Sequence, residues 1–169
     1  MNICIAAEPQ IKINVKLVEL PGDSKIPKNV KAVLETPKAD IMSCPALIRS
    51  SGVKANISVT RDFKLKDKGP YTVGLQCSIT PILKSSSIHY SIDSEMIDFG
   101  GFAEGSATQA PIFNILKVSD IDGTLKLGET AIIRLGQRIE EQMISEKGKP
   151  DKKVPYVRTL VLLLDFTKA

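Results

Sequence analysis

The sequence predicts a mainly β protein with one or two short helices. Apolar and polar side chains alternate along 10–20, which is the pattern of a strand with one buried face. The same alternation runs through 53–63 and through the long pair 71–83 and 87–99, which the polar stretch KSSS joins. The final segment, 156–168, is apolar on both faces, so it is expected to lie centrally in a sheet. We expect seven to nine strands in all.

One short helix is expected at 28–36. Val30, Val33 and Leu34 follow the i, i+3, i+4 spacing that places side chains on one helical face. Pro37 should end this helix, because proline lacks the backbone N–H that a continuing helix needs. The loop before the helix is the polar stretch PGDSKIP.

The second half of the chain alternates between strand and connection. Residues 100–111 are rich in Gly and Ala and are expected to form a flexible excursion. Residues 112–136 should supply two or three strands, with a hairpin turn at Asp122–Gly123. The polar segment 137–155 is predicted to be partly helical around 139–144.

Composition describes an ordinary globular chain. The 169 residues carry a net charge of +4, with 25% charged and 5% aromatic residues. Scattered lysines and few aromatics argue against nucleic-acid binding, and no apolar run reaches the ~20 residues of a membrane helix. We therefore expect one domain over 10–169. Residues 1–9 are expected to be disordered or to be the end of an export signal, in which case the protein would be exported.

Three cysteines and one histidine are the candidates for side-chain chemistry. Cys4, Cys44 and Cys77 form no C-x-x-C pair, so neither a zinc site nor a redox dithiol is indicated. Buried thiols are the favoured interpretation for Cys44 and Cys77, and a disulfide between them is the alternative. His89 lies on the polar face of its strand, with Asp93 on the same face, and is expected to face solvent.

One stretch resembles a calcium-binding loop. Counted from Val118, the residues Asp120, Asp122, Gly123 and Glu129 take the third, fifth, sixth and twelfth places of an EF-hand. Its first place is apolar, however, and its flanks are rich in β-branched residues rather than helical, which favours a turn between strands. Because phosphate-loop and nucleophile-elbow motifs are also absent from the sequence, we expect no catalytic residue, no metal and no cofactor.

Several stretches in a fixed order resemble the C-terminal domain of bacterial secretins, the ring-forming channels of type II and type III secretion and of type IV pili. The opening strand IKINVKLVEL, the pair ADIMSCPALIRS and VKANISV, the segment TVGLQCSITPIL, the turn LGETAII and the last strand YVRTLVLLLDFTK take the family's places from residue 10 to the end. Arg134–Leu135 stands where the family has a double glycine. The residues at family positions are Ser43, Pro45, Ala55, Val73, Gly74, Pro81, Gly128 and Thr130.

The resemblance implies a short, divergent relative of the secretin domain with mixed or antiparallel sheets, sandwich-like as a monomer. It further implies a non-enzymatic structural protein of the bacterial envelope, in the periplasm or outer membrane. Such a protein would associate with itself or with other secretion proteins, and would meet a membrane only through an assembly. The strands at 10–20 and 71–99 are expected to provide the edges for this association. Gly74 and Pro81 would shape a central strand, Pro45 would set a break, and Gly128 and Thr130 would set the last hairpin.

Two other functions remain open on the sequence alone. One is a soluble β-sandwich that binds a protein or small ligand through the small-residue loop at 100–110. The other, which the sequence favours least, is an enzyme that uses Cys44 or His89.

Overall fold

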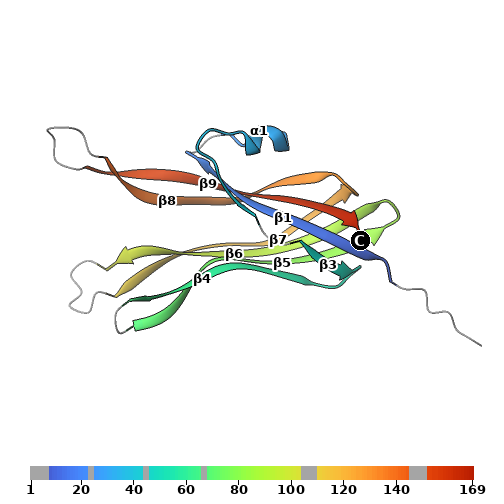
Figure 1. Ribbon diagram of the computed structural model, residues 1–169, viewed down its shortest axis with the longest axis horizontal. Helices are drawn as coiled ribbons and strands as arrows, with labels where there is room; N and C mark the ends of the chain where they lie inside the picture. The colour runs from blue at the N-terminus through green and yellow to red at the C-terminus, as the bar shows by residue number, and fades with distance from the viewer. Residues whose placement is uncertain (1–7, 23–24, 44–45, 66–67, 104–109, 145–151) are drawn as a thin grey trace, which may run out of the picture.

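Two β-sheets lie face to face in the structure (Figure 1). The structure is a computed structural model and describes residues 8–22, 25–43, 46–65, 68–103, 110–144 and 152–169. Nine strands and one short helix occupy these ranges, so the expected mainly β class is confirmed. All strand pairs are antiparallel, which gives the sandwich-like arrangement expected for a single copy.

The first sheet, which we call sheet A, is built around the two ends of the chain. Its order is β2 (Asp40–Ser43), β1 (Gln10–Pro21), β9 (Lys152–Lys168) and β8 (Thr130–Ile144). The short β3 (Leu47–Ser50) also pairs with β1, beyond the end of β2. β1 therefore lies inside the sheet and pairs with β9 over most of its length.

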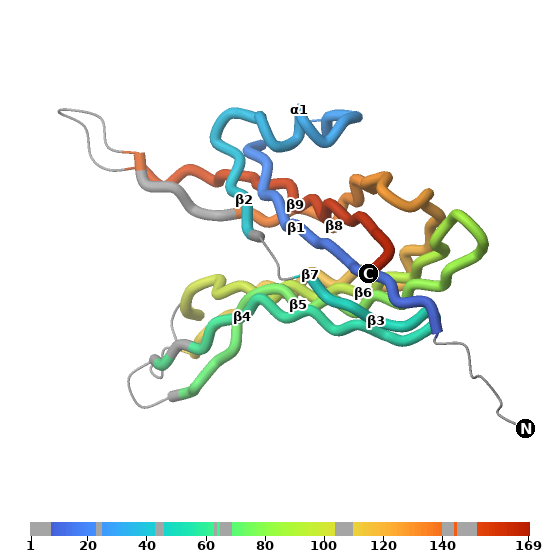
Figure 2. The backbone as a smooth tube through the Cα atoms, turned by 45° about the vertical axis from the view of Figure 1, so that its right-hand side comes forward, coloured from blue at the N-terminus to red at the C-terminus, as the bar shows by residue number. Residues whose placement is uncertain are grey.

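The second sheet, sheet B, is a simple meander. Its order is β4 (Ala55–Leu65), β5 (Lys68–Lys84), β6 (Ser87–Phe102) and β7 (Pro111–Lys126). Figure 2 shows sheet B running along the lower side of the molecule, with sheet A above it. The inward side chains of both sheets meet in one apolar core.

Alternation in the sequence accounts for this core. Ile11, Ile13, Val15 and Leu17 of β1 are at most 2% exposed and face sheet B, and each such burial contributes about 1.5–3 kcal/mol. In β9 the run 160–164 is buried on both faces, as its composition predicts.

The helix α1 (Val30–Leu34) covers the outer face of sheet A, as Figure 1 shows. The side chain of Asn29 caps it by accepting a hydrogen bond from the N–H of Ala32 at 2.8 Å. Val33 packs against the outward side chains of β1 and β9, which are Val18, Leu20, Val161 and Leu163. The helix is shorter than the expected 28–36, but its buried face is the one that the spacing predicts.

The predicted hairpin turn at Asp122–Gly123 is wrong. β7 runs straight through both residues, and the chain turns at 127–128, where Gly128 has a φ of +84°. Gly123 lies opposite Tyr90 of β6, and a Cβ at this position would overlap the tyrosine ring. The glycine is therefore needed for close side-chain packing across two strands, not for a turn.

The predicted helical character around 139–144 is also wrong. β8 continues to Ile144 and pairs residue by residue with β9 down to Lys152. The strand pairing with β9 prevails over local helix propensity here. The segment 145–151 lies outside the described residues.

The predicted edge strands are the third correction. β1, β5 and β6 each have a hydrogen-bonded neighbour on both sides, so the segments 10–20 and 71–99 lie inside the sheets. The edges of sheet B are β4 and β7, and those of sheet A are β8 and the short pair β2 and β3. The alternation of a strand shows that one face is buried, but it does not show which strands end a sheet.

Candidate assembly surface and inter-sheet charge cluster

The sandwich has two open sides, each formed by strands of both sheets. β7 and β8 follow each other in sequence and form the first open side. The second open side lies at the opposite lateral edge of each sheet and is formed by β4 of sheet B together with β2 and β3 of sheet A. Each of these strands is paired with a neighbour on one side only within the described part of the chain. Their other sides present backbone N–H and C=O groups that another strand can bind.

Most of the large hydrophobic side chains that are exposed belong to segments that form these two open sides. Five belong to the first side, counting the end of β6 next to β7, and three belong to β2, β3 or the link that leads into β4. In order, these are Phe102, Ile112, Ile115, Ile139 and Ile144, then Ile41, Ile48 and Val53. Ile115 and Ile139 are 62% and 66% exposed. Among the described residues, Ile82 on β5 is the remaining member of this class.

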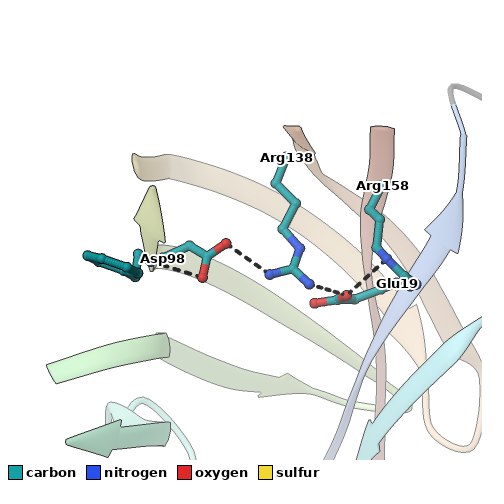
Figure 3. A network of polar contacts seen from close by, with 5 residues as sticks. Glu19, Asp98, Arg138 and Arg158 are labelled. Atoms are coloured by element: carbon teal, nitrogen blue, oxygen red, sulfur yellow. Dashed lines mark hydrogen bonds and ion pairs between the residues drawn. The ribbon is translucent and has the colours of Figure 1, made fainter. Parts of the chain in front are cut away.

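A cluster of charged side chains joins the two sheets (Figure 3). Arg138 of β8 donates from Nη2 to Oε2 of Glu19 on β1 at 2.7 Å, and from Nη1 to Oδ2 of Asp98 on β6 at 3.0 Å. Nε of Arg158 on β9 lies 3.9 Å from the same Glu19 oxygen. Glu19 is 3% exposed, whereas Asp98 is 29% exposed. Arg138 therefore bonds a deeply buried carboxylate in its own sheet and a half-buried one in the other sheet.

The charge cluster lies where the apolar core ends. Pockets open on either side of it. One, of about 360 Å³, lies toward the second open side, with Glu19, Asp40, Arg61 and Asp98 in its walls. The other, of about 350 Å³, lies toward the first open side and is rimmed by Ile115 and Ile139. Arg138 and Asp98 belong to the walls of both pockets, so they stand between them.

These charged residues were missed by the sequence analysis, although a signal was present. Glu19 continues the inward phase of Ile11, Ile13, Val15 and Leu17. In the same way, Asp98 continues the inward phase of the apolar residues of β6. Burial of a carboxylate at an inward-facing position of a strand costs folding free energy unless the charge is paired. Each of these two acids therefore indicates a cationic partner. The sequence alone did not identify Arg138 as that partner.

The residues at family positions are spread over the molecule and do not converge on one site. Ser43 ends β2, Ala55 begins β4 and is fully buried, and Thr130 begins β8 opposite Asp165. Pro45 and Cys44 lie outside the described residues. These positions belong to different strands and to both sheets. Their scaffold roles remain predictions.

Four further family positions lie at bends or in the core. Val73 is 4% exposed, and Gly74 beside it has a φ of +125° in β5. Pro81 is buried opposite Tyr90. Gly128 lies in the connection between the sheets, and its N–H donates to the backbone oxygen of Phe166 at 2.9 Å. This connection links β7 of sheet B to β8 of sheet A, so it is not the hairpin that the sequence suggested.

His89 and Asp93 face solvent on the outer side of sheet B, as expected. Nδ1 of His89 is 3.0 Å from Oγ1 of Thr124, and Asp93 accepts a hydrogen bond from the N–H of Asp120 at 3.1 Å. Cys77 is 3% exposed, in agreement with a buried thiol.

The described residues hold no group of three or more His, Cys, Asp or Glu side chains placed to share a metal ion. Within the same ranges, no helix is long and apolar enough to cross a membrane. The residues of the EF-hand pattern belong mostly to the extended strand β7, where Asp120 occupies a bulge with a φ of +59°. A strand does not wrap its ligands around one point as an EF-hand loop does.

No protein-family model matches the sequence, and no curated protein does. Solved structures do match. ExeD of Aeromonas hydrophila gives a TM-score of 0.54 at 14% identity, over 96% of this chain and 49% of that one. The InvG secretin domain β-barrel of the Salmonella SPI-1 injectisome gives 0.53 at 14% identity, over 96% and 64%. A chain of the Klebsiella pneumoniae type II secretion system outer membrane complex gives 0.55 at 12% identity, over 95% and 40%.

This chain has the secretin-domain fold. The match covers nearly the whole chain in each case, so it includes both sheets and the connections between them. The resemblance inferred from the sequence motifs is thereby confirmed at the level of the fold. The secretin-like chain spans between 40% and 64% of the length of these three solved chains.

Proposed function

We propose that this chain is a non-enzymatic structural subunit that associates side by side with copies of itself in a secretin-like assembly of the bacterial cell envelope. The observation that carries the proposal is the pair of open sides, each with unpaired strand edges and exposed apolar side chains. Residues 10–169 act as one domain in this proposal. The residues at family positions serve it as scaffold.

The strand directions suit such an association. Sheet B has four antiparallel strands, so β4 and β7 run in opposite directions. When β7 of one copy meets β4 of the next, the new pair is therefore antiparallel as well. Sheet A is also four strands wide, since β2 and β3 share one edge by pairing with different parts of β1. β8, at the other edge, therefore runs antiparallel to β2 and β3. Both sheets can thus continue from copy to copy without a change of pattern.

Contact between two different sides has a geometric consequence. A head-to-tail contact repeats until the rotation closes a ring, or it grows into a filament. Closure into a ring leaves no strand edge exposed. It also brings β8, which carries the exposed Ile139 and Ile144, next to β2 and β3 of the neighbouring copy, which carry the exposed Ile41 and Ile48.

The solved relatives support an envelope location. The matching structures are described as an injectisome secretin and as part of an outer membrane complex of type II secretion. We propose the same compartment for this chain, with itself or other secretion proteins as partners.

Light scattering of the purified protein, with and without detergent, tests the proposal. We expect a multimer of many copies for the native sequence. The double variant Ile115→Lys with Ile139→Lys should shift the protein to monomer, because it places two charges on the first open side. Ile82→Lys is the matched control, since Ile82 is 44% exposed but lies on the interior strand β5. This control should assemble as the native protein does.

Two outcomes count against the proposal. One is a native protein that stays monomeric at all concentrations, with detergent and without. The other is unchanged assembly of the Ile115→Lys and Ile139→Lys double variant.

A further inference from the structure

We propose that the Asp98–Arg138 ion pair is a releasable latch between the two sheets. When it is closed, it holds sheet B against sheet A at the end of the core. When it opens, the end of sheet B formed by β6 and β7 moves away from β8 and β9 of sheet A.

The position of the pair at the boundary of the core is the first support. Met96 on β6, Leu116 on β7 and Leu160 on β9 belong to the apolar cluster between the sheets. The next inward position of β6 is Asp98, and it meets Arg138 instead of another apolar side chain. Figure 1 shows the end of β6 and the beginning of β7 diverging from the end of β8 and the beginning of β9, and Asp98 and Arg138 lie in the second halves of β6 and β8. The ion pair therefore closes the place where the sheets begin to diverge.

The strands bend on both sides of the pair. The register of β6 with β7 shifts between Phe99 and Gly101, directly after Asp98. The register of β8 with β9 shifts between Arg134 and Gly136, two residues before Arg138. Bulges of this kind bend a strand and weaken its pairing locally. Both sheets are therefore bent next to the ion pair, β6 directly after Asp98 and β8 shortly before Arg138.

The two bonds of Arg138 differ in how easily they are replaced by water. Glu19 is 3% exposed, and loss of its bond would leave a buried carboxylate without its closest cation. Asp98 is 29% exposed and stands between two open pockets, so water can take over its hydrogen bonds. Opening of the latch therefore breaks the bond to Asp98 and leaves Arg138 on Glu19.

The segment that is released carries a chain of aromatic contacts. Phe99 contacts Phe102 and Phe113, with ring centroids 5.3 and 6.1 Å apart, and Phe113 contacts Tyr71 at 5.1 Å. These rings tie the beginning of β5 and β7 to the end of β6, so this end of sheet B moves as one unit. In a ring of copies, this movement would change the width at one end. That consequence rests on the proposed function, whereas the latch itself belongs to the single chain.

Hydrogen exchange of the full chain tests the latch, at a concentration where light scattering gives monomer. In Asp98→Asn, we expect amides of 98–102 and 111–116 to exchange about tenfold faster or more, because a charge-assisted bond has been weakened. Amides of 79–92 in the core of sheet B should keep their native rates. Asp98→Glu, which retains the carboxylate, should stay closer to the native rates than Asp98→Asn.

Glu95→Gln is the matched control, since Glu95 lies on the same strand but on the outer face of sheet B, where it lines a different pocket. It should exchange as the native protein does. Unchanged exchange in Asp98→Asn would overturn the latch, and so would a uniform increase that includes 79–92. A protein that never assembles but shows the local increase would refute the proposed function and leave the latch standing.

Discussion

Loss of the Arg138 guanidinium should be among the most destabilising single changes in this protein. Arg138→Met removes both the 2.7 Å bond to Glu19 and the 3.0 Å bond to Asp98. Removal of one partner from a buried ion pair costs about 3–5 kcal/mol, because the other charge stays buried. Arg158, 3.9 Å from Glu19, offsets part of this cost. We therefore expect a loss of about 3 kcal/mol in the free energy of unfolding.

Urea denaturation followed by circular dichroism measures this loss. For a chain of this length, about 3 kcal/mol corresponds to a fall of about 6–12 °C in melting temperature. The slope of the urea transition should not change, because the folded surface stays the same. Adding Glu19→Gln to Arg138→Met should recover part of the loss, since the buried group is then neutral.

Arg61→Met is the control for the substitution itself. Arg61 is exposed on β4 and lines the neighbouring pocket, so its loss should cost less than about 0.5 kcal/mol. A cost below about 1 kcal/mol for Arg138→Met would refute the structural role of the cluster. An equal loss in Arg61→Met would show that the effect does not depend on Glu19 and Asp98.

Four further outcomes are expected from the same structure. Gly123→Ala should cost about 1–3 kcal/mol in urea denaturation, because the new Cβ overlaps the ring of Tyr90, and Tyr90→Val in the same chain should relieve part of the cost. Gly128→Ala should cost about 1–2 kcal/mol in the same assay, because its φ of +84° is strained for a residue with a Cβ. Calcium should leave the melting temperature unchanged, and a rise would restore the EF-hand interpretation. Burial raises the pKa of the Tyr90 phenol. The neutral Tyr90 phenol should therefore contribute its full share of the free energy of unfolding below the ordinary tyrosine pKa of about 10. This contribution should be lost as the pH rises through the raised pKa of the folded protein. Urea denaturation at a series of alkaline pH values, with Tyr90→Phe as the comparison, would measure the loss.

Strand periodicity carried most of the fold prediction. The alternation in β1, β4, β5 and β6 and the doubly apolar β9 all correspond to strands that the structure contains. Each of these signals is local, since it depends on which face of a single strand is buried.

The errors arose where distant residues decide the outcome. The pair Asp122–Gly123 favours a turn when it is considered alone. The packing of Gly123 against Tyr90, which decides its conformation, involves a residue of another strand and is not visible in the local sequence. The segment 139–144 was assigned to a helix because its strand state depends on pairing with β9. The charge cluster was not predicted for the same reason, since Arg138 is 119 positions from Glu19 and 40 positions from Asp98 in the sequence. The phase of the two acids indicated that partners exist, but only the fold shows which cation they share.

Cross-linking of single and paired cysteines tests side-by-side assembly most directly. The background replaces the three native cysteines, and Thr60→Cys on β4 and Lys117→Cys on β7 place exposed thiols on the edge strands of the two open sides. With a short bifunctional maleimide, the paired variant should give a ladder of multimers, because β7 of one copy meets β4 of the next. Each single variant should stay monomeric after denaturation. Strong dimers from either single variant, or no ladder from the pair, would contradict the head-to-tail contact.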